Sequence, residues 1–291
     1  GNKWANVGEA TINIGGEAVV TDFVQAGATY NDKSTPKSHS VGSCTLNITG
    51  ITVPELYLGS YGNCTLGSAN VTITDAVVKK LAVNRSGTNT LPTANLTLTN
   101  ATVEQWPADM AAITTANLTY QNTELESYNS FAAWESLSLK NSTVRMMVKY
   151  EGPASVAVDA DSTLYISGDL NAENEVPAKS GEGKIVYLVA SNYEQGDPIT
   201  MKYDDRLDLS GKTVLVFNGG TPTSYQVGYG VTEGTKDLCV VKYDSANQKL
   251  IATGIGTAKV VIGDKLHEVT VEPAPISLFL LIGQSNMAGS E

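Results

Sequence analysis

The sequence predicts an all-β protein in which a parallel β-helix (β-solenoid) is followed by a small β-sandwich module. Three observations predict this fold class. Only 17% of the 291 residues are charged, compared with about 25% in a typical soluble protein, and Thr, Asn, Ser, Gly and Val, which favour strands and turns, take their place. A strand–corner–strand pattern recurs through the first part of the chain. Short alternating strands without that repeat follow it.

The repeat is a gapless alignment of five segments: TLNITGITV, NVTITDAVV, NLTLTNATV, NLTYQNTEL and SLSLKNSTV. Its first apolar column consists of residues spaced 25, 25, 22 and 19 apart: Leu46, Val71, Leu96, Leu118 and Leu137. Three further apolar columns lie two, seven and ten positions on: Ile48, Ile73, Leu98, Tyr120 and Leu139; Val53, Val78, Val103, Leu125 and Val144; and Leu56, Leu81, Trp106, Tyr128 and Met147. Polar residues separate the first two columns, and this period-two alternation is typical of a strand with one buried face.

A corner separates the two strands of each repeat. The position four residues after each start holds only residue types that tolerate left-handed backbone angles: Gly50, Asp75, Asn100, Asn122 and Asn141. A strand, a corner, a second strand and a variable loop describe one coil of a solenoid. Weaker copies at 12–19, 164–168 and 207–217 extend the predicted solenoid domain to residues 8–218. A leucine-rich-repeat horseshoe is the alternative, but it needs a longer helical arm than these Thr- and Asn-rich loops provide.

The net negative charge of the chain argues against nucleic acids and anionic membranes as partners. The net charge is −11, with 19 Lys and Arg residues, so the chain lacks the basic surface that nucleic acids and anionic bilayers require. No apolar run approaches the ~18 residues of a membrane span. We therefore expect no nucleic-acid partner and no membrane span.

Two residue types have both a functional and a structural interpretation. Cys44, Cys64 and Cys239 are odd in number and lack C-x-x-C spacing, so we expect buried thiols and neither a metal site nor a cofactor, with a Cys44–Cys64 disulfide as the alternative. The N-x-S/T sequons mostly recur at matching repeat positions, so repetition of an Asn- and Thr-rich strand explains them better than glycosylation does. The eight sequons begin at Asn47, Asn63, Asn70, Asn84, Asn95, Asn100, Asn117 and Asn141.

Residues 219–273 form a separate predicted domain. After Asn218 and two glycines the long repeat stops, and short alternating strands follow at 224–231, 237–243, 249–253, 257–262 and 266–271. The stretch IATGIGTAKVVIG, at 251–263, resembles the bacterial Ig-like modules of surface proteins. The resemblance implies a reduced Ig-like β-sandwich, because the segment is shorter than a full module of that type.

A serine block follows the last predicted strand. The apolar segment Ile276–Ile282 leads directly into GQSNMAG at 283–289. A serine just beyond a strand can project its hydroxyl at a strand-to-helix turn, where backbone N–H groups stabilise an oxyanion. The block resembles the first conserved block of SGNH-type hydrolases, in the carbohydrate-esterase branch that includes sialate O-acetylesterases and acetylxylan esterases. This resemblance implies that residues 274–291 begin a hydrolase domain with Ser285 as its nucleophile. The other members of the serine block are Gly283, Gln284 and Asn286.

The resemblance ends at Glu291, before the positions where the family has its remaining oxyanion donors and its Asp-x-x-His. A serine without a general base is a weak nucleophile at neutral pH, so we expect this fragment to be inactive as an esterase. Asp264 and His267 have the Asp-x-x-His spacing. A hairpin turn followed by a strand explains these two residues without catalysis.

Acidic residues between 159 and 175 have two interpretations. They could bind Ca²⁺, but they lack the glycine and closing glutamate of an EF-hand loop, which favours a solvated acidic loop. These residues are Asp159, Asp161, Asp169, Glu173 and Glu175.

The aromatic residues also have two interpretations. Trp106, Tyr128 and Trp134 could stack on a sugar, but Trp106 and Tyr128 lie in an apolar column of the repeat, which favours core packing. The solvent face of the repeat carries Thr, Asn, Ser and Gln rather than the clustered charges of pectin-active β-helix enzymes, which argues against a lyase or glycosidase there.

Together these features predict the non-catalytic region of a secreted bacterial carbohydrate esterase, located outside the cell or at its surface. The solenoid would act as a scaffold or as a glycan-binding, adhesive module, with cell-wall, dietary or host glycans as partners. The alternative is a serine acetylesterase that removes O-acetyl groups from glycans and is active only in a longer parent chain. We also expect the apolar segment Ile276–Ile282 to pair with an edge of the Ig-like module or with another copy of the chain.

Overall fold

The structure is a computed structural model that describes residues 7–28, 39–62, 64–85, 89–107, 110–227, 230–232 and 239–275, with the backbone alone at 173, 225–227 and 230–232. The described residues form strands, loops and two short 3₁₀ turns, Glu173–Glu175 and Ala190–Asn192, which confirms the predicted all-β class. The chain divides into two compact units, residues 1–194 with 216–218 and residues 195–215 with 219–291. Within the described part, no helix has the length and hydropathy of a membrane-spanning segment.

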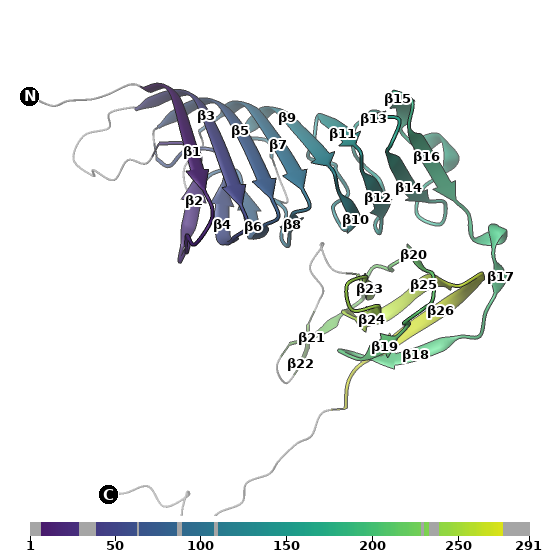
Figure 1. Cartoon of the computed structure of the whole chain (residues 1–291). Helices are drawn as coiled ribbons and strands as arrows, with labels where there is room; N and C mark the ends of the chain where they lie inside the picture. The colour runs from purple at the N-terminus through teal and green to yellow at the C-terminus, as the bar shows by residue number, and fades with distance from the viewer. Residues whose placement is uncertain are drawn as a thin grey trace, which may run out of the picture. The chain divides into compact units, whose positions relative to one another are not determined.

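The first unit is built from parallel strands in three sheets (Figure 1). The odd-numbered strands form an eight-stranded sheet: β1 (Val7–Ile14), β3 (Ser40–Thr49), β5 (Thr65–Thr74), β7 (Leu91–Thr99), β9 (Ile113–Gln121), β11 (Ser136–Lys140), β13 (Ser155–Val158) and β15 (Ala178–Ser180). The even-numbered strands form two four-stranded sheets: β2 (Phe23–Gln25), β4 (Thr52–Tyr57), β6 (Val77–Ala82) and β8 (Thr102–Val103); and β10 (Glu124–Ser127), β12 (Thr143–Met146), β14 (Thr163–Ser167) and β16 (Lys184–Leu188). Each repeat therefore contributes one strand to the large sheet and one to a small sheet.

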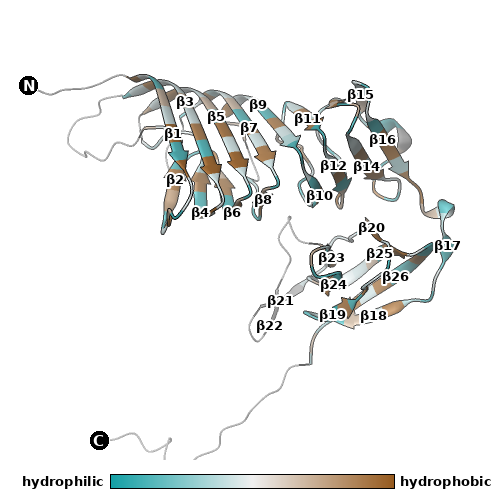
Figure 2. Cartoon of the chain, in the orientation of Figure 1, coloured by the Kyte–Doolittle hydropathy of each residue, from teal (hydrophilic) through white to brown (hydrophobic). Residues whose placement is uncertain are grey.

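The predicted apolar columns are in register across these sheets. In the large sheet, the first column joins Leu46, Val71, Leu96, Leu118 and Leu137, each paired with the next across adjacent parallel strands. None of the five is more than 1% exposed. In the small sheets Val53 pairs with Val78, and Leu125 pairs with Val144. Figure 2 shows brown, hydrophobic segments on the strands of the large sheet. The repeat alignment is confirmed, because a shift by one residue would expose every member of a column.

The predicted corners have left-handed backbone angles. The φ angles lie between 46° and 70° at all five corner positions of the repeat and at Gly16 in the first turn of the stack. Asn and Asp occupy most of these positions because they tolerate this conformation better than other residues with a Cβ. The corner turns the chain from the large sheet into the small one, which places both apolar strand faces toward a shared core.

The aromatic residues of the repeat pack mainly in this core. Trp134 is 5% exposed, and its ring centroid lies 6.0 Å from that of Trp106 in an edge-to-face arrangement. Trp106 packs against the core cluster, and Tyr128 is half-buried. Phe131 is fully buried and makes edge-to-face contacts with Tyr120 and with a second tyrosine from the next turn. The core-packing interpretation is confirmed for Trp106 and Trp134.

The weak repeat copies differ in outcome. Ile12 pairs with Leu46, so the copy at 12–19 begins in register. It does not continue as predicted, because Val19, at the position of the third apolar column, is 83% exposed. Leu164, however, pairs with Val144 and therefore lies in the second strand of its repeat rather than the first. The first strand of that repeat is β13, where Val156 continues the column of Leu137.

The copy predicted at 207–217 is not a repeat of the parallel stack. β19 (Arg206–Asp208) pairs antiparallel with β24 (Lys249–Ala252), with Leu207 opposite Leu250. Alternation of polar and apolar residues identifies a half-buried strand but does not specify a parallel or antiparallel partner. The stack of parallel strands ends with β16, earlier than the predicted residue 218, and the second unit starts before the predicted residue 219.

The strands that follow the parallel stack have shorter, mainly antiparallel pairings. One sheet has the order β17–β26–β25–β20 with β18 also paired to β26, another has the order β19–β24–β23, and β21 pairs with β22. The strands not yet introduced are β17 (Glu194–Gln195), β18 (Ile199–Lys202), β20 (Val214–Asn218), β21 (Tyr225–Val227), β22 (Gly230–Thr232), β23 (Val241–Asp244), β25 (Gly256–Ile262) and β26 (Lys265–Glu272). The second unit has its own buried residues, each at 0% exposure: Val240, Val241, Leu250, Val260 and Val269.

Candidate functional site

The predicted serine block lies outside the described residues. This applies to Ser285 and to its neighbours Gly283, Gln284 and Asn286, and also to the apolar segment Ile276–Ile282. The candidate site is therefore built from what the structure describes.

The outward side of the large sheet is the most regular polar surface of the first unit. We call the outward side chains of β3, β5, β7 and β9 the polar face. They form four rows across the strands: Ser43, Ser68, Thr93 and Thr115; Thr45, Asn70, Asn95 and Asn117; Asn47, Thr72, Thr97 and Thr119; and Thr49, Thr74, Thr99 and Gln121. Every one is exposed or half-buried, whereas the apolar residues between the rows are buried.

The second of these rows is joined by side-chain hydrogen bonds. Asn95 donates Nδ2–H to Oδ1 of Asn70 at 2.8 Å, and Asn117 donates to Oδ1 of Asn95 at the same distance. Ser136, in β11, donates its hydroxyl to Oδ1 of Asn117 at 2.6 Å. Three of the sequon asparagines thus have a structural role, which supports repetition as the reason for the sequons. A primary amide has two N–H donors and two acceptor lone pairs, so each linked amide retains hydrogen-bonding capacity toward solvent.

The polar face carries no charge. Residues 40–49, 65–74, 91–99 and 113–121 contain no Asp, Glu, Lys or Arg. The small sheets differ, because Lys80 pairs with Glu55 at 3.1 Å and Arg145 pairs with Glu124 at 2.9 Å. A surface designed for solubility is roughly 25–35% charged. A run of four strands without a charge is therefore a distinctive chemical property of this face.

A second polar ladder follows the corners. Asn100 donates Nδ2–H to Oδ1 of Asp75 at 2.7 Å, and Asn141 donates to Oδ1 of Asn122 at 3.0 Å. The carboxylate of Asp159 accepts the backbone N–H of Asn141 at 3.0 Å. Asp159 also accepts the hydroxyl hydrogen of a serine three residues on. These contacts stabilise the corners of successive turns and assign Asp159, one of the acidic residues weighed as a Ca²⁺ ligand, to the ladder.

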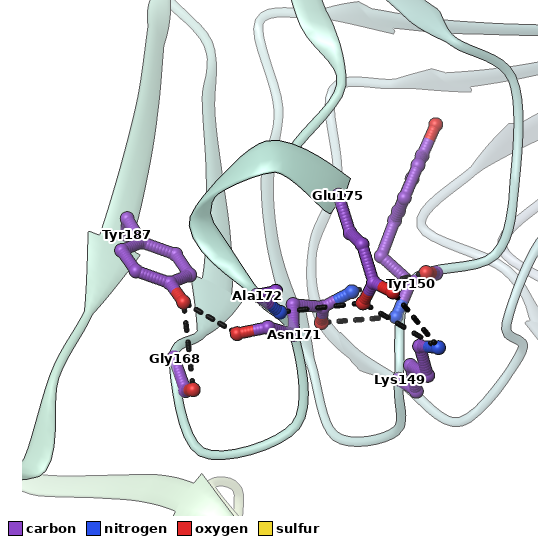
Figure 3. A network of polar contacts seen from close by, with 7 residues as sticks. All are labelled: Lys149, Tyr150, Gly168, Asn171, Ala172, Glu175 and Tyr187. Atoms are coloured by element: carbon purple, nitrogen blue, oxygen red, sulfur yellow. Dashed lines mark hydrogen bonds and ion pairs between the residues drawn. The ribbon is translucent and has the colours of Figure 1, made fainter.

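Figure 3 shows a polar network in the loops of the last turns. The side-chain amide of Asn171 makes two hydrogen bonds to the backbone of Tyr150. Its Oδ1 accepts the N–H of Tyr150 at 3.2 Å, and its Nδ2 donates to the carbonyl of Tyr150 at 3.1 Å. Tyr187 donates its hydroxyl hydrogen to the carbonyl of Asn171. Asn171 is only 3% exposed, so the network satisfies buried polar groups and fixes the loop.

Glu175, another of the acidic residues weighed as Ca²⁺ ligands, belongs to this network. Glu175 pairs with Lys149 at 3.4 Å and accepts the N–H of Ala172 at 3.2 Å. Within the described residues, no group of three or more His, Cys, Asp or Glu side chains is placed to hold a metal ion. The contacts of Asp159 and Glu175 give these two carboxylates a structural role.

Asp264 and His267 lie in a hairpin. Ile262 pairs with Lys265, so Gly263 and Asp264 form the two-residue turn, with a φ of 68° at the glycine. His267 follows in β26, and its Nδ1 lies 2.8 Å from the carbonyl oxygen of Asp197. The hairpin interpretation of this Asp-x-x-His spacing is confirmed.

Another polar cluster lies on the small sheet formed by β2, β4, β6 and β8. Tyr57 donates its hydroxyl hydrogen to Glu55, which also pairs with Lys80. Burial, followed by the bond to Glu55, raises the pKa of Tyr57 to about 12, and the hydrogen bonds from Tyr57 and Lys80 lower the pKa of Glu55. Arg85 lies 4.0 Å above the ring of Phe23. Tyr57 therefore stays protonated at neutral pH and serves as a hydrogen-bond donor that orders its neighbours.

The three cysteines are buried, and none of them forms a disulfide within the part of the chain that the structure describes. The structure therefore has no Cys44–Cys64 disulfide. Desolvation by burial raises the pKa of both thiols, which makes them poor nucleophiles. They pack as small apolar side chains, as the sequence predicts.

No protein-family model, no curated protein and no solved structure matches this chain.

Proposed function

We propose that this chain is the non-catalytic region of a secreted bacterial carbohydrate esterase and that it places the catalytic domain on a glycan. In this proposal the first unit is a β-solenoid and the second is a reduced Ig-like module. The parallel strand order, the in-register columns and the left-handed corners support the solenoid. The antiparallel pairings of β25 with β26 and of β23 with β24 support the Ig-like module.

The observation that carries the esterase part of the proposal is the serine block. Gly283, Gln284, Ser285 and Asn286 follow a strand-type apolar segment in the order that SGNH-type carbohydrate esterases have. Ser285 would then be the nucleophile of a domain whose general base comes from downstream sequence. The alternative function, an acetylesterase that removes O-acetyl groups from glycans, is the activity of that longer parent chain.

An assay with p-nitrophenyl acetate tests this proposal. We expect the 291-residue fragment to show no Ser285-dependent turnover, because a serine without a general base is a weak nucleophile. A chain extended beyond Glu291 to the next Asp-x-x-His should hydrolyse the ester, and its Ser285→Ala variant should lose at least ~10³-fold in kcat.

Two outcomes would contradict the proposal. Turnover by the fragment that Ser285→Ala abolishes would make the fragment itself an enzyme. An extended chain that is folded but inactive toward acetyl esters would remove the esterase assignment.

A further inference from the structure

We propose that the polar face binds a neutral, linear polysaccharide. This inference rests on the proposed function, because it names the surface and the ligand of its glycan-binding role. The surface consists of the four rows defined above on β3, β5, β7 and β9.

The first argument is the charge of the ligand. The polar face has hydroxyl and amide groups but no ionisable side chain on four consecutive strands, and the whole chain carries a net charge of −11. An anionic polymer would find no cation on this face and would be repelled by the chain at long range. A neutral polymer rich in hydroxyl groups matches both the hydrogen-bonding groups and the lack of charge.

The second argument is preorganisation. The amides of Asn70, Asn95 and Asn117 are already held in one orientation by the 2.8 Å bonds between them. The third row, which contains Asn47, begins with a similar bond, because Asn47 donates Nδ2–H to Oδ1 of Asn13 in β1 at 2.8 Å. Side chains that are ordered before binding lose less conformational entropy when the ligand arrives. This offsets the weakness of individual neutral hydrogen bonds.

The third argument is periodicity. Adjacent strands of a sheet lie about 4.8 Å apart, so each row presents an equivalent polar group at every strand. A linear polymer that lies along a row, across the strands, meets a similar group at each successive step. Many weak and equivalent contacts then add through effective concentration, which a monosaccharide cannot exploit.

A second copy of this chain is a less suitable occupant. The buried centre of a stable protein interface is depleted of charge but enriched in aromatic residues, Met and Arg. The outward rows of the polar face contain none of these residue types. The face is thus uncharged without being apolar, which is the chemistry of a saccharide partner.

Affinity electrophoresis in native gels tests the proposal. The 291-residue chain is run in gels that contain hydroxyethylcellulose, soluble xylan or polygalacturonate. The test variant carries Thr72→Lys and Thr97→Lys, adjacent members of one row. The matched control carries Thr52→Lys and Thr102→Lys, two exposed threonines on the small sheet of β4, β6 and β8. Both double variants add two positive charges, and thermal unfolding followed by circular dichroism verifies that both are folded.

We expect retardation of the parent by at least one of the two neutral polymers and not by polygalacturonate. The Thr72→Lys/Thr97→Lys variant should bind the neutral polymer roughly tenfold more weakly, which corresponds to about 1.4 kcal/mol, because a neutral ligand leaves the buried ammonium groups unpaired. The control should match the parent.

Three results would overturn the proposal: no retardation of the parent by either neutral polymer, equal retardation of the two double variants, or stronger retardation by polygalacturonate. A dimer that Thr72→Lys/Thr97→Lys dissociates, without polymer binding, would identify a second copy as the occupant. The same experiments distinguish this proposal from the proposed function. If no neutral polymer retards the chain but the extended chain shows Ser285-dependent turnover, only the ligand assignment fails. If a neutral polymer retards the chain but the extended chain shows no such turnover, the esterase assignment fails and the ligand assignment stands.

Discussion

At the scale of single residues, asparagine is repeated in this chain because it meets two structural requirements. At the corners it tolerates a left-handed backbone angle, and its amide bonds to the equivalent residue of the neighbouring turn. Asn100 has a φ of 46° and donates to Asp75 at 2.7 Å, while its own backbone N–H donates to the hydroxyl of Thr123 at 2.8 Å. On the large sheet, Asn95 makes a similar ladder from an extended strand. These structural roles support repetition as the origin of the sequons at Asn70, Asn95 and Asn100.

Two substitutions of Asn100 separate these requirements. Asn100→Gly and Asn100→Ala both lose the bond to Asp75, but only alanine is strained at this φ. We therefore expect Asn100→Ala to have a free energy of unfolding about 1 kcal/mol lower than Asn100→Gly. Urea denaturation of both variants measures the difference. Equal midpoints, or a less stable glycine variant, would show that the left-handed angle does not determine the residue at this corner.

At the scale of elements, the stability of the stack depends on columns that run through successive strands. Leu98 is fully buried and pairs with Ile73 on one side and with Tyr120 on the other, whereas its neighbour Thr97 points outward in the polar face. One strand thus divides its residues between core and surface with a period of two.

Alanine substitutions at these neighbours test that division. Leu98→Ala should lower the free energy of unfolding by about 2–5 kcal/mol, because it leaves a cavity in the column. Thr97→Ala should change it by less than about 0.5 kcal/mol, as expected of a surface site. Chemical denaturation checks both values, and similar losses at the two positions would contradict the register.

The repeat could be predicted because both of its signals, alternation and a left-handed corner, come from local residue types. Pairing partners depend on residues far apart in the chain. The alternation around Leu164 therefore does not show that it belongs to the second strand of a repeat, and the alternation around Leu207 does not show that its partner strand is antiparallel. The amide ladder of Asn70, Asn95 and Asn117 needs the register before it can be seen, although their equal spacing from each repeat start was a usable signal. The cluster around Tyr57 joins residues of different turns that no motif connects.

At the scale of the whole molecule, the two units differ in what they can contribute. The first unit presents an ordered, uncharged array of hydroxyl and amide groups on a parallel sheet. The second is a short module of mainly antiparallel strands that precedes the serine block in the chain. In the proposed parent protein, recognition of the polymer and cleavage of its acetyl esters are therefore functions of different parts of the chain.

The most direct test of this division measures acetate release by the chain extended beyond Glu291 on a soluble and on an insoluble substrate. For the Thr72→Lys/Thr97→Lys variant we predict an unchanged kcat/KM on p-nitrophenyl acetate and a roughly tenfold lower rate on insoluble acetylated xylan, while Thr52→Lys/Thr102→Lys matches the parent on both. Equal rates of all three proteins on the insoluble polymer, or an equal loss on both substrates, would contradict the account.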